Sequence, residues 1–229
     1  MASMFVDRKY HVARRWSNLV LRKIAPLFTG EVVNVSGWED RDKEGGTYAE
    51  YFTAKTAYFR TNYSGHYGFQ GDNGEIGLDL TADLPESLKG RFDVVFNHTT
   101  LEHVFEVRKA FANLCAMSRD AVIVVVPFSQ IQHESDSYGD YWRLTPSCLR
   151  KLFEENGLTV VYEAESPAKN AAVYLLFVGS RLPKRYELRM PPYRPIKIAG
   201  HWIGRRLLAE AADLARQGTA VLLRRGRQG

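Results

Sequence analysis

The chain has 229 residues, of which 45% are hydrophobic and 25% charged, and its formal net charge is +5 at pH 7. This length suits one substantial domain with an appendage, and no apolar run reaches the roughly 20 residues of a membrane-spanning helix. The first residues, MASMFVDRKYHVARRW, contain no apolar segment of the kind found in secretory signals, so we expect no such signal.

The charge is concentrated at the two ends. Residues 1–25 hold six basic groups and one acid, and residues 181–229 hold twelve and three. These ends carry +5 and +9, which against +5 overall leaves −9 for residues 26–180. Basic ends favour contact with anionic lipid or nucleic acid, but a solvated charged face has the same composition. Both interpretations stay open.

The first half of the chain alternates between helix and strand patterns. Residues 7–27 read as an amphipathic helix, and we assign residues 1–28 to a basic N-terminal helix. Its apolar side is expected to hold Val12, Trp16, Leu19, Val20 and Ile24, and its basic residues Arg14, Arg15, Arg22 and Lys23 lie mostly on the other side. An apolar strand at residues 31–35 follows. A short helix at residues 47–55 and strands at residues 57–63, 75–80 and 92–96 complete this half.

The stretch FDVVFNHTTLEHV, residues 92–104, is the centre of the pattern. Its apolar first half suits a strand buried on both faces, and it turns polar at Asn97, His98 and Thr99. Ligands of open α/β sheets bind at the carboxyl ends of such strands. A helix at residues 102–117 and an apolar strand at residues 121–126 follow.

The second half closes the sheet with a hairpin. A long polar and aromatic segment, residues 127–146, precedes a helix that Thr145 or Ser147 caps and that ends at Gly157. The connection between the next two strands, residues 158–163 and 172–179, is too short for a parallel crossover. These two strands must therefore be antiparallel.

This order of elements predicts an α/β fold, a doubly wound, Rossmann-like sheet of seven strands with an antiparallel last strand. The sheet domain occupies residues 29–180. Residues 181–229 are a basic, proline-containing linker and a helix at about residues 201–223, which packs on the domain, on a partner or on a membrane surface.

The two cysteines, Cys115 and Cys148, fall among apolar residues of expected helices. Buried free thiols are the ordinary state in a reducing compartment. We therefore expect a cytoplasmic protein, with membrane association through the basic ends left open.

Residues 31–179 carry a family resemblance. The LEHV sequence after the strand at residues 92–96, the later strand AVIVVVPF and the segment DYWRLTP resemble class I S-adenosylmethionine-dependent methyltransferases. They are most similar to the group found in bacterial glycan and cell-surface biosynthesis. The resemblance implies S-adenosylmethionine as the cofactor and a Rossmann-like methyltransferase sheet.

The resemblance also implies where the cofactor is held. Its methionine part is expected over the turn after the first strand, at Val35, Ser36 and Gly37, because glycine lets the backbone come close. This chain departs from the family's G-x-G-x-G, since Trp38, Glu39 and Asp40 follow directly. An ordinary strand-to-loop glycine is the alternative.

The remaining cofactor contacts are expected at the ends of later strands. Asn62 takes the place of the acid that usually holds the ribose. Adenine is expected at Asp79 with Leu80, or at Asp83 with Leu84, and Asp79 is preferred because it closes its strand. Asn97, His98 and Thr99 are expected to line the cleft beside the sulfonium.

Catalytic groups are expected in the segment 127–146. If the acceptor is a hydroxyl, His133 is the candidate general base, and Asp140 or Asp136 orients it. The candidate residues of the acceptor pocket, chosen because aromatic faces suit sugar rings and arginine suits anionic groups, are Tyr141, Trp142 and Arg143.

Purely structural roles are the alternatives to these assignments. Asp140 and Arg143 can form a structural ion pair, and Tyr141 and Trp142 can cover the sheet edge. His103 is expected in a packing or supporting role. A metal at His133, Glu134, Asp136 and Asp140 is not expected, because their spacing fits no rigid ligand pattern.

The sequence thus predicts an enzyme that O-methylates a saccharide or a cell-surface polymer precursor. The expected partner is a glycan or another small-molecule acceptor, and self-association into a homo-oligomer is left open. Two alternatives remain: a non-catalytic binding or scaffold protein with the same fold, and a nucleic-acid methyltransferase that uses the basic ends.

Overall fold

The computed structural model describes residues 11–63, 69, 71, 74–166 and 172–196. Contacts divide the chain into residues 1–199 and residues 200–229, and all described residues belong to the first unit. The helix predicted at about residues 201–223 lies outside the described residues. Within the described part, no helix is both long and apolar enough to cross a membrane.

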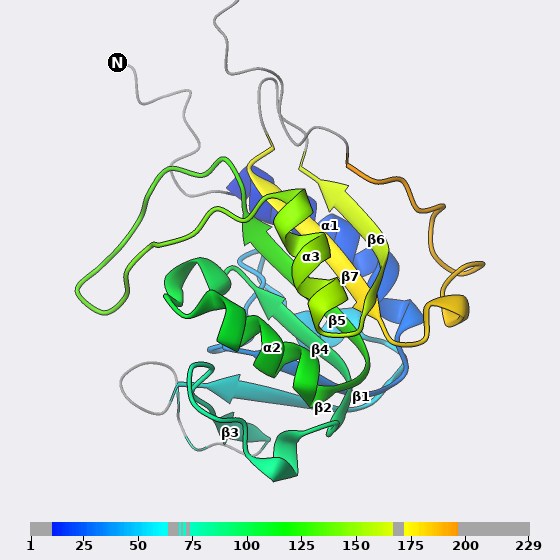
Figure 1. Cartoon of the computed structure of the whole chain (residues 1–229), viewed down its shortest axis with the longest axis horizontal. Coiled ribbons are helices and arrows are strands. Elements are labelled where there is room, and N and C mark those ends of the chain that lie inside the picture. Colours follow the sequence, from blue (N-terminus) through cyan, green and yellow to red (C-terminus); the bar gives the residue numbers. More distant parts are fainter. Residues whose placement is uncertain (1–10, 64–68, 70, 72–73, 167–171, 197–229) are drawn as a thin grey trace, which may run out of the picture. The chain divides into compact units, whose positions relative to one another are not determined.

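A seven-stranded sheet forms the centre of the first unit, with the strand order β3-β2-β1-β4-β5-β7-β6 (Figure 1). Strand β7 runs antiparallel to both of its neighbours, and the remaining pairs are parallel. The fold prediction is confirmed, including the antiparallel last strand. The strands are β1 Gly30–Val35, β2 Lys55–Asn62, β3 Glu75–Gly77, β4 Phe92–His98, β5 Ser118–Pro127, β6 Thr159–Glu165 and β7 Tyr174–Ser180.

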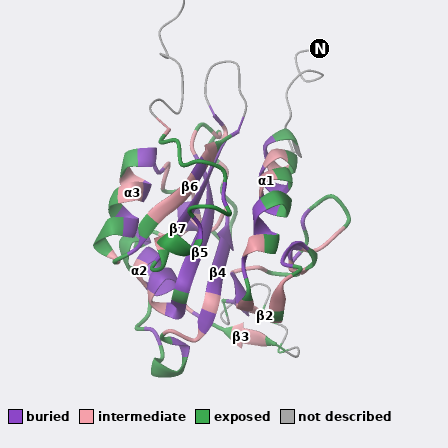
Figure 2. Cartoon of the chain, turned by 90° about the vertical axis from the view of Figure 1, so that its right-hand side faces the viewer, coloured by how far each residue is buried: buried purple, intermediate pink, exposed green. Residues whose placement is uncertain are grey.

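Three α-helices cover the two faces of this sheet. Helix α1, His11–Ile24, lies on one face, while α2, Val107–Met117, and α3, Pro146–Glu155, lie on the other (Figure 2). Each face has its own core of buried residues. The short 3-10 helices are η2 Ala25–Leu27, η3 Tyr48–Tyr51, η4 Glu86–Leu88, η5 Leu101–His103 and η6 Pro183–Arg185.

Helix α1 buries only part of the predicted stripe. Ile24 is buried, and Trp16 and Val20 pack against the core, but Val12 and Leu19 are exposed. The buried stripe includes Leu21 and the polar residues Ser17 and Asn18. Polar residues are tolerated here because they have partners: Ser17 Oγ lies 2.9 Å from a ring nitrogen of His98, and Asn18 donates to the Asp42 carbonyl at 2.9 Å.

The helix predicted at residues 102–117 is wrong in its first turn. The chain instead forms η5, leaves it at Val104 in an extended conformation, and begins α2 only at Val107. The reason is a long-range contact. The Glu102 carbonyl accepts hydrogen bonds from the amides of Tyr141 at 2.7 Å and Trp142 at 3.3 Å, so it is occupied by the later loop and not by a helix.

Strand β3 is also shorter than the prediction of residues 75–80. It ends at Gly77, and the Asp79 carboxylate then accepts the backbone amide of Thr81 at 2.8 Å. This side-chain-to-backbone bond two residues ahead forms a local turn in competition with the strand. The turn places Asp79 at the end of the strand and not within it.

The helix predicted at residues 47–55 is only the 3-10 helix η3, and β2 already begins at Lys55, whereas the predicted ends of α3 are confirmed. Thr145 caps α3, since its side chain accepts the Cys148 amide at 3.2 Å, and Gly157 follows the helix with a φ of +70°. Cys115 and Cys148 are both free thiols. Burial raises the pKa of Cys115 to about 12, as expected for an inert core residue.

The start of the predicted C-terminal linker packs on the sheet domain. Asp120 accepts hydrogen bonds from Arg185 at 3.1 Å and from the Tyr186 hydroxyl at 2.8 Å. Tyr186 and Met190 are buried in the same core as α1. The division into residues 1–28, 29–180 and 181–229 stays a prediction.

Candidate functional site

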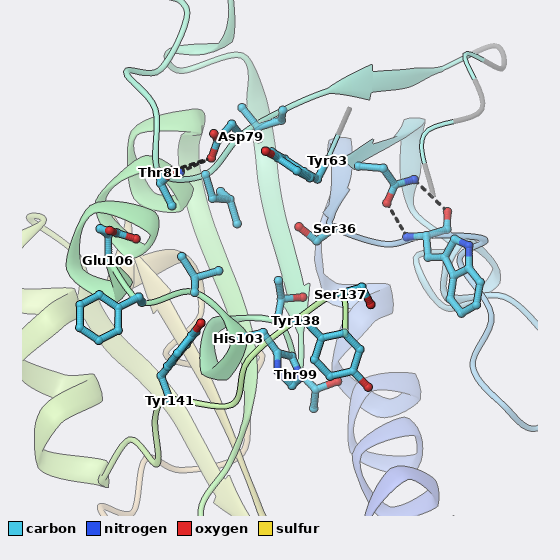
Figure 3. A pocket seen from close by; sticks show the side chains of 17 residues that line it. Ser36, Tyr63, Asp79, Thr81, Thr99, His103, Glu106, Ser137, Tyr138 and Tyr141 are labelled. Atoms are coloured by element: carbon cyan, nitrogen blue, oxygen red, sulfur yellow. Dashed lines mark hydrogen bonds between the residues drawn. The ribbon is translucent and has the colours of Figure 1, made fainter. Parts of the chain in front are cut away.

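A cavity of about 820 Å³ opens at the carboxyl ends of β1, β2 and β4 (Figure 3). Six short stretches of the chain contribute to it. Its lining residues are Ser36, Trp38, Asn62, Tyr63, Leu78, Asp79, Leu80, Thr81, Thr99, Thr100, His103, Val104, Phe105, Glu106, Ser137, Tyr138 and Tyr141.

The turn after β1 forms one wall. Ser36 and Trp38 have left-handed backbone conformations, with φ of 55° and 45°. The amides of Ser36 and Gly37 donate to Thr61 on the neighbouring strand at 3.2 and 3.1 Å. Of the predicted residues Val35, Ser36 and Gly37, only Ser36 lines the cavity, while Val35 is buried in the core.

Glycine is needed at position 37 because the Asn34 side chain occupies the space of a Cβ atom. A Cβ atom there would lie 2.6 Å from Nδ2 of Asn34. Asn34 in turn donates to the buried Asp40 carboxylate at 2.6 Å, which also accepts the Tyr58 hydroxyl at 2.6 Å. Burial raises the pKa of Asp40. This network holds the turn in the place where the related pattern has further glycines.

Asn62, the predicted ribose contact, braces the same turn. Its Oδ1 accepts the Trp38 amide at 2.7 Å, and its Nδ2 donates to the Trp38 carbonyl at 3.2 Å and to Glu75 Oε1 at 2.5 Å. Asn62 also lines the cavity. It therefore shapes the wall and presents part of its surface to a ligand.

The structure separates the two adenine candidates. Asp79 and Leu80 line the cavity. The Asp83 side chain is fully exposed and pairs with Lys109 at 2.6 Å, which is a surface ion pair. The geometry thus favours Asp79 with Leu80 over Asp83 with Leu84.

Of the three residues expected beside the sulfonium, only Thr99 lines the cavity. Asn97 is buried and donates to the Val35 carbonyl at 2.9 Å. His98 lies on the α1 face, where it stacks on Tyr48 and meets Arg14 Nη1 at 2.7 Å. The structure therefore does not bring Asn97 or His98 to the cavity: the alternation of side chains along β4 turns His98 toward α1, and Asn97 is held by the Val35 carbonyl.

Burial, together with the nearby Arg14 charge, holds the pKa of His98 well below its usual range. His98 is thus a neutral core residue. Arg14, which the sequence placed on the polar side of its helix, also donates to Thr99 Oγ1 at 3.1 Å. Helix α1 therefore fixes a cavity residue 85 positions away, and no local sequence signal indicates this.

The Asp140–Arg143 ion pair, predicted as the alternative to an acceptor site, is present. Arg143 contacts both Asp140 oxygens, at 2.5 and 2.6 Å, and also donates to the carbonyls of Gln130, Ile131 and Trp142. These bonds lower the pKa of Asp140 to about 2. Arg143 braces its own loop and does not line the cavity.

The neighbouring aromatic residues differ in role. The Trp142 indole donates to the carbonyls of Val104 and Phe105, each at 3.1 Å, and it lies outside the cavity lining. Tyr141 lines the cavity and is half exposed. Of the three predicted acceptor residues, the structure brings only Tyr141 to the cavity.

His133 contacts the predicted orienting acid. Its backbone amide donates to Asp140 Oδ2 at 2.7 Å, and its ring Nδ1 lies 3.2 Å from the same oxygen. The ring packs edge-on against His103, with centroids 4.9 Å apart. His103 lines the cavity and His133 does not. The histidine expected in a supporting role is therefore the one exposed to the cavity.

Glu102 is the residue that the sequence analysis missed. It is buried, and neither of its carboxylate oxygens has a hydrogen-bond partner among the described residues. Burial raises its pKa to about 8. Together with His103 and His133 it forms a group of potential metal ligands; the set His133, Glu134, Asp136 and Asp140 is not the one that the fold assembles. An acid four residues beyond the end of a buried strand is the only local signal.

Solved structures share this arrangement of elements. A 1,6-didemethyltoxoflavin-N1-methyltransferase from Burkholderia thailandensis, solved with bound 1,6-didemethyltoxoflavin and S-adenosylhomocysteine, is 17% identical, with 73% of this chain and 77% of that chain covered and a TM-score of 0.54. An S-adenosylmethionine-dependent methyltransferase from Mesorhizobium loti is 12% identical, with 73% and 98% covered and a TM-score of 0.53.

The chain has the fold of the S-adenosylmethionine-dependent methyltransferases. A third similar structure is a putative methyltransferase of Haloferax volcanii in complex with the Trm112 activator, 14% identical, with 76% and 91% covered and a TM-score of 0.53. No protein-family model matches the sequence, and no curated protein matches it significantly. At these identities the likeness shows the fold.

Proposed function

We propose that this protein is an S-adenosylmethionine-dependent methyltransferase that methylates a hydroxyl of a small, ring-containing acceptor. The observation that carries the proposal is the cavity at the carboxyl ends of the parallel strands, where open α/β sheets bind their ligands. Similar structures with this fold were solved with S-adenosylmethionine or S-adenosylhomocysteine.

The cofactor is proposed to lie along the β1, β2 and β4 ends of the cavity. Ser36 and Thr99 would face its methionine part, while Asn62 supports the turn that the ribose meets. Asp79 keeps one carboxylate oxygen beyond the Thr81 contacts, which both use Oδ1. That oxygen can accept the exocyclic amine of adenine, next to the apolar surface of Leu80.

The acceptor is proposed to lie against the aromatic wall on the opposite side. This wall comprises His103, Phe105, Tyr138 and Tyr141, and His103 packs against Tyr138 at a centroid distance of 4.6 Å. Aromatic faces suit the apolar faces of sugar or heteroaromatic rings. A saccharide or a cell-surface polymer precursor, as the resemblance implies, fits this wall.

In the transfer the acceptor oxygen attacks the methyl carbon in line with the carbon–sulfur bond. The oxygen–carbon bond forms as the carbon–sulfur bond breaks, and S-adenosylhomocysteine leaves. The hydroxyl proton passes to a histidine, for which we retain His133, oriented by Asp140; because His133 lies outside the cavity lining, one water molecule relays the proton. Alignment and exclusion of water supply much of the acceleration.

Calorimetry with S-adenosylmethionine and S-adenosylhomocysteine tests the cofactor assignment. Asp79→Asn should weaken binding about 5- to 20-fold, since it removes one charge-assisted hydrogen bond. Asp83→Asn is the matched control and should bind like the wild type. Failure of the wild type to bind either compound would rule out the enzyme.

An acceptor screen with methyl-labelled cofactor tests the reaction. His133→Ala should abolish labelling of a hydroxyl acceptor while cofactor affinity stays nearly unchanged, because His133 lies outside the cavity lining. Wild-type rates in this variant would remove His133 from the mechanism.

One observation supports the rival of a non-catalytic binding protein. The turn after β1 is held by Asn34, Asp40 and Asn62, without the further glycines of the related pattern. Binding of an acceptor without cofactor would favour this rival.

We further propose a cytoplasmic protein whose basic ends contact anionic surfaces. Retention on heparin together with methylation of RNA or DNA would favour a nucleic-acid acceptor.

A further inference from the structure

We propose that Glu102, His103 and His133 bind a divalent transition-metal ion at the wall of the cavity. One carboxylate oxygen and one nitrogen of each ring all lie within 4.8 Å of one another. His103 also lines the cavity, and Figure 3 shows its ring beside Tyr138. An ion held there would sit at the boundary between the protein and a bound acceptor.

The buried Glu102 carboxylate is the first reason. Glu102 is 2% exposed, and within the described part of the chain neither of its oxygens has a hydrogen-bond partner. A buried carboxylate without partners is costly, and binding a cation removes that cost. The nearby arginines are engaged elsewhere: Arg143 with Asp140, and Arg14 with Tyr48, His98 and Thr99.

The two histidines present the right tautomers. Nδ1 of His103 lies 2.6 Å from the Gly139 carbonyl oxygen, which can only accept, so Nδ1 carries the proton and Nε2 keeps its lone pair. Nε2 is 3.7 Å from Glu102 Oε1. Zinc–nitrogen distances of about 2.1 Å place neighbouring ligand atoms about 3.4 Å apart, so a small contraction suffices.

His133 is held in the same way. Its Nδ1 lies 3.2 Å from Asp140 Oδ2, an ionised oxygen that accepts, which leaves Nε2 for a metal. The Gln130 side-chain amide also lies 3.2 Å from Nδ1, and its Oε1 lacks a partner; with the amide turned over, Oε1 accepts the Nδ1 proton. Carboxylate–histidine–metal chains of this kind fix the ligand ring.

The donor set selects the class of ion. Two imidazole nitrogens and one carboxylate oxygen suit Zn²⁺, Co²⁺, Fe²⁺ or Mn²⁺, whereas Mg²⁺ and Ca²⁺ prefer oxygen ligands throughout. Three protein ligands leave coordination positions open for another oxygen. We therefore expect one ion with an exchangeable position on the cavity side.

The role of the ion rests on the proposed function. An acceptor hydroxyl in the open position would have a lowered pKa and would release its proton to water before the oxygen attacks the methyl carbon. His133 would then act as a ligand and not as the base. Metal binding itself is measured without any acceptor, so the two proposals fail separately.

The test uses the full chain after treatment with a chelator. Titration with Co²⁺ should show one binding site and visible absorption bands, and Zn²⁺ should displace the Co²⁺. The isosteric Glu102→Gln and the truncation His133→Ala should each weaken Co²⁺ binding at least about tenfold. Glu134→Gln, which changes an exposed acid in the same loop, is the matched control and should bind like the wild type.

Circular dichroism and S-adenosylhomocysteine binding confirm that each variant is folded. Absence of Co²⁺ binding in the wild type, or equal binding in the folded Glu102→Gln and His133→Ala variants, would overturn the metal site. Metal binding without any methyl transfer would support the site and count against the proposed function. Methyl transfer that survives the chelator, with no metal bound, would support the proposed function and count against the metal site.

Discussion

At the scale of single residues, the turn after β1 is stabilised by side chains in place of glycines. Ser36, Trp38 and Asp40 all have φ values between 45° and 59°, a conformation that is costly for residues other than glycine. The Asn62 and Asp40 hydrogen bonds offset that cost. A departure from a glycine pattern is therefore compatible with a well-formed turn.

Gly37→Ala should show how tightly this turn is packed. Gly37 does not need a left-handed φ, so the cost comes from the new Cβ, which would lie 2.6 Å from Asn34 Nδ2 and displace it from Asp40. We expect the free energy of unfolding to fall by about 1–3 kcal/mol, measured by urea denaturation. In an Asn34→Ala background the same change should cost much less; an equal cost in both backgrounds would contradict the explanation.

At the scale of elements, the loop of residues 127–146 decides where α2 begins. The amides of Tyr141 and Trp142 in this loop donate to the Glu102 carbonyl. Glu102 and His103 therefore lie in η5 and not in α2. The same loop carries His133 and continues into α3. The position and capping of α3 therefore help to hold the loop.

Thr145→Ala should test this cap. The variant loses the bond from the Cys148 amide to Thr145 Oγ1, and we expect the free energy of unfolding to fall by about 1 kcal/mol. Thr145→Ser keeps a hydroxyl and should behave like the wild type. If urea denaturation finds the two variants equally stable, the capping bond does not contribute.

At the scale of the whole molecule, the edge of the sheet formed by the carboxyl ends of the parallel strands differs from the edge formed by their amino ends. The carboxyl edge holds the cavity. At the amino edge Asp93 accepts hydrogen bonds from Arg119 at 2.9 and 3.0 Å and from the Glu31 amide at 2.7 Å, which joins β1, β4 and β5. We interpret the amino edge as stabilising and the carboxyl edge as functional.

Asp93→Asn should therefore lower stability in a pH-dependent way without changing cofactor affinity. The Arg119 hydrogen bonds lower the pKa of Asp93 in the folded protein. The ionised group thus contributes stability above its unfolded pKa of about 3.9, and this contribution is lost as pH falls through the lower folded value. Urea denaturation of both proteins should show a larger difference at pH 7 than in acid. A difference that does not change with pH would contradict the assignment.

Much of the fold could be predicted because its signals are local. Apolar runs mark the buried strands, Thr145 and Gly157 mark the ends of α3, and the short connection between β6 and β7 requires the antiparallel pairing. Asp79 is preferred from the sequence because it closes its predicted strand, and it lies at the cavity. These features depend on residues close together in the chain.

The other half of the site depends on contacts between distant residues. His98 faces α1 because of strand alternation and its contacts with Arg14 and Ser17, and Arg143 is engaged by Asp140 and loop carbonyls. Sequence spacing shows which side chains are polar but not what each one meets.

Periodicity and connection length thus sufficed to predict the alternation of strands and helices along the chain, the antiparallel end of the sheet and the edge that carries the cavity. They could not predict that Glu102 is buried, without a hydrogen-bond partner among the described residues, beside His103 and His133. The physical reason is that a loop 39 residues away occupies the Glu102 carbonyl, and such a competition between local and long-range hydrogen bonds is settled only when the chain is folded.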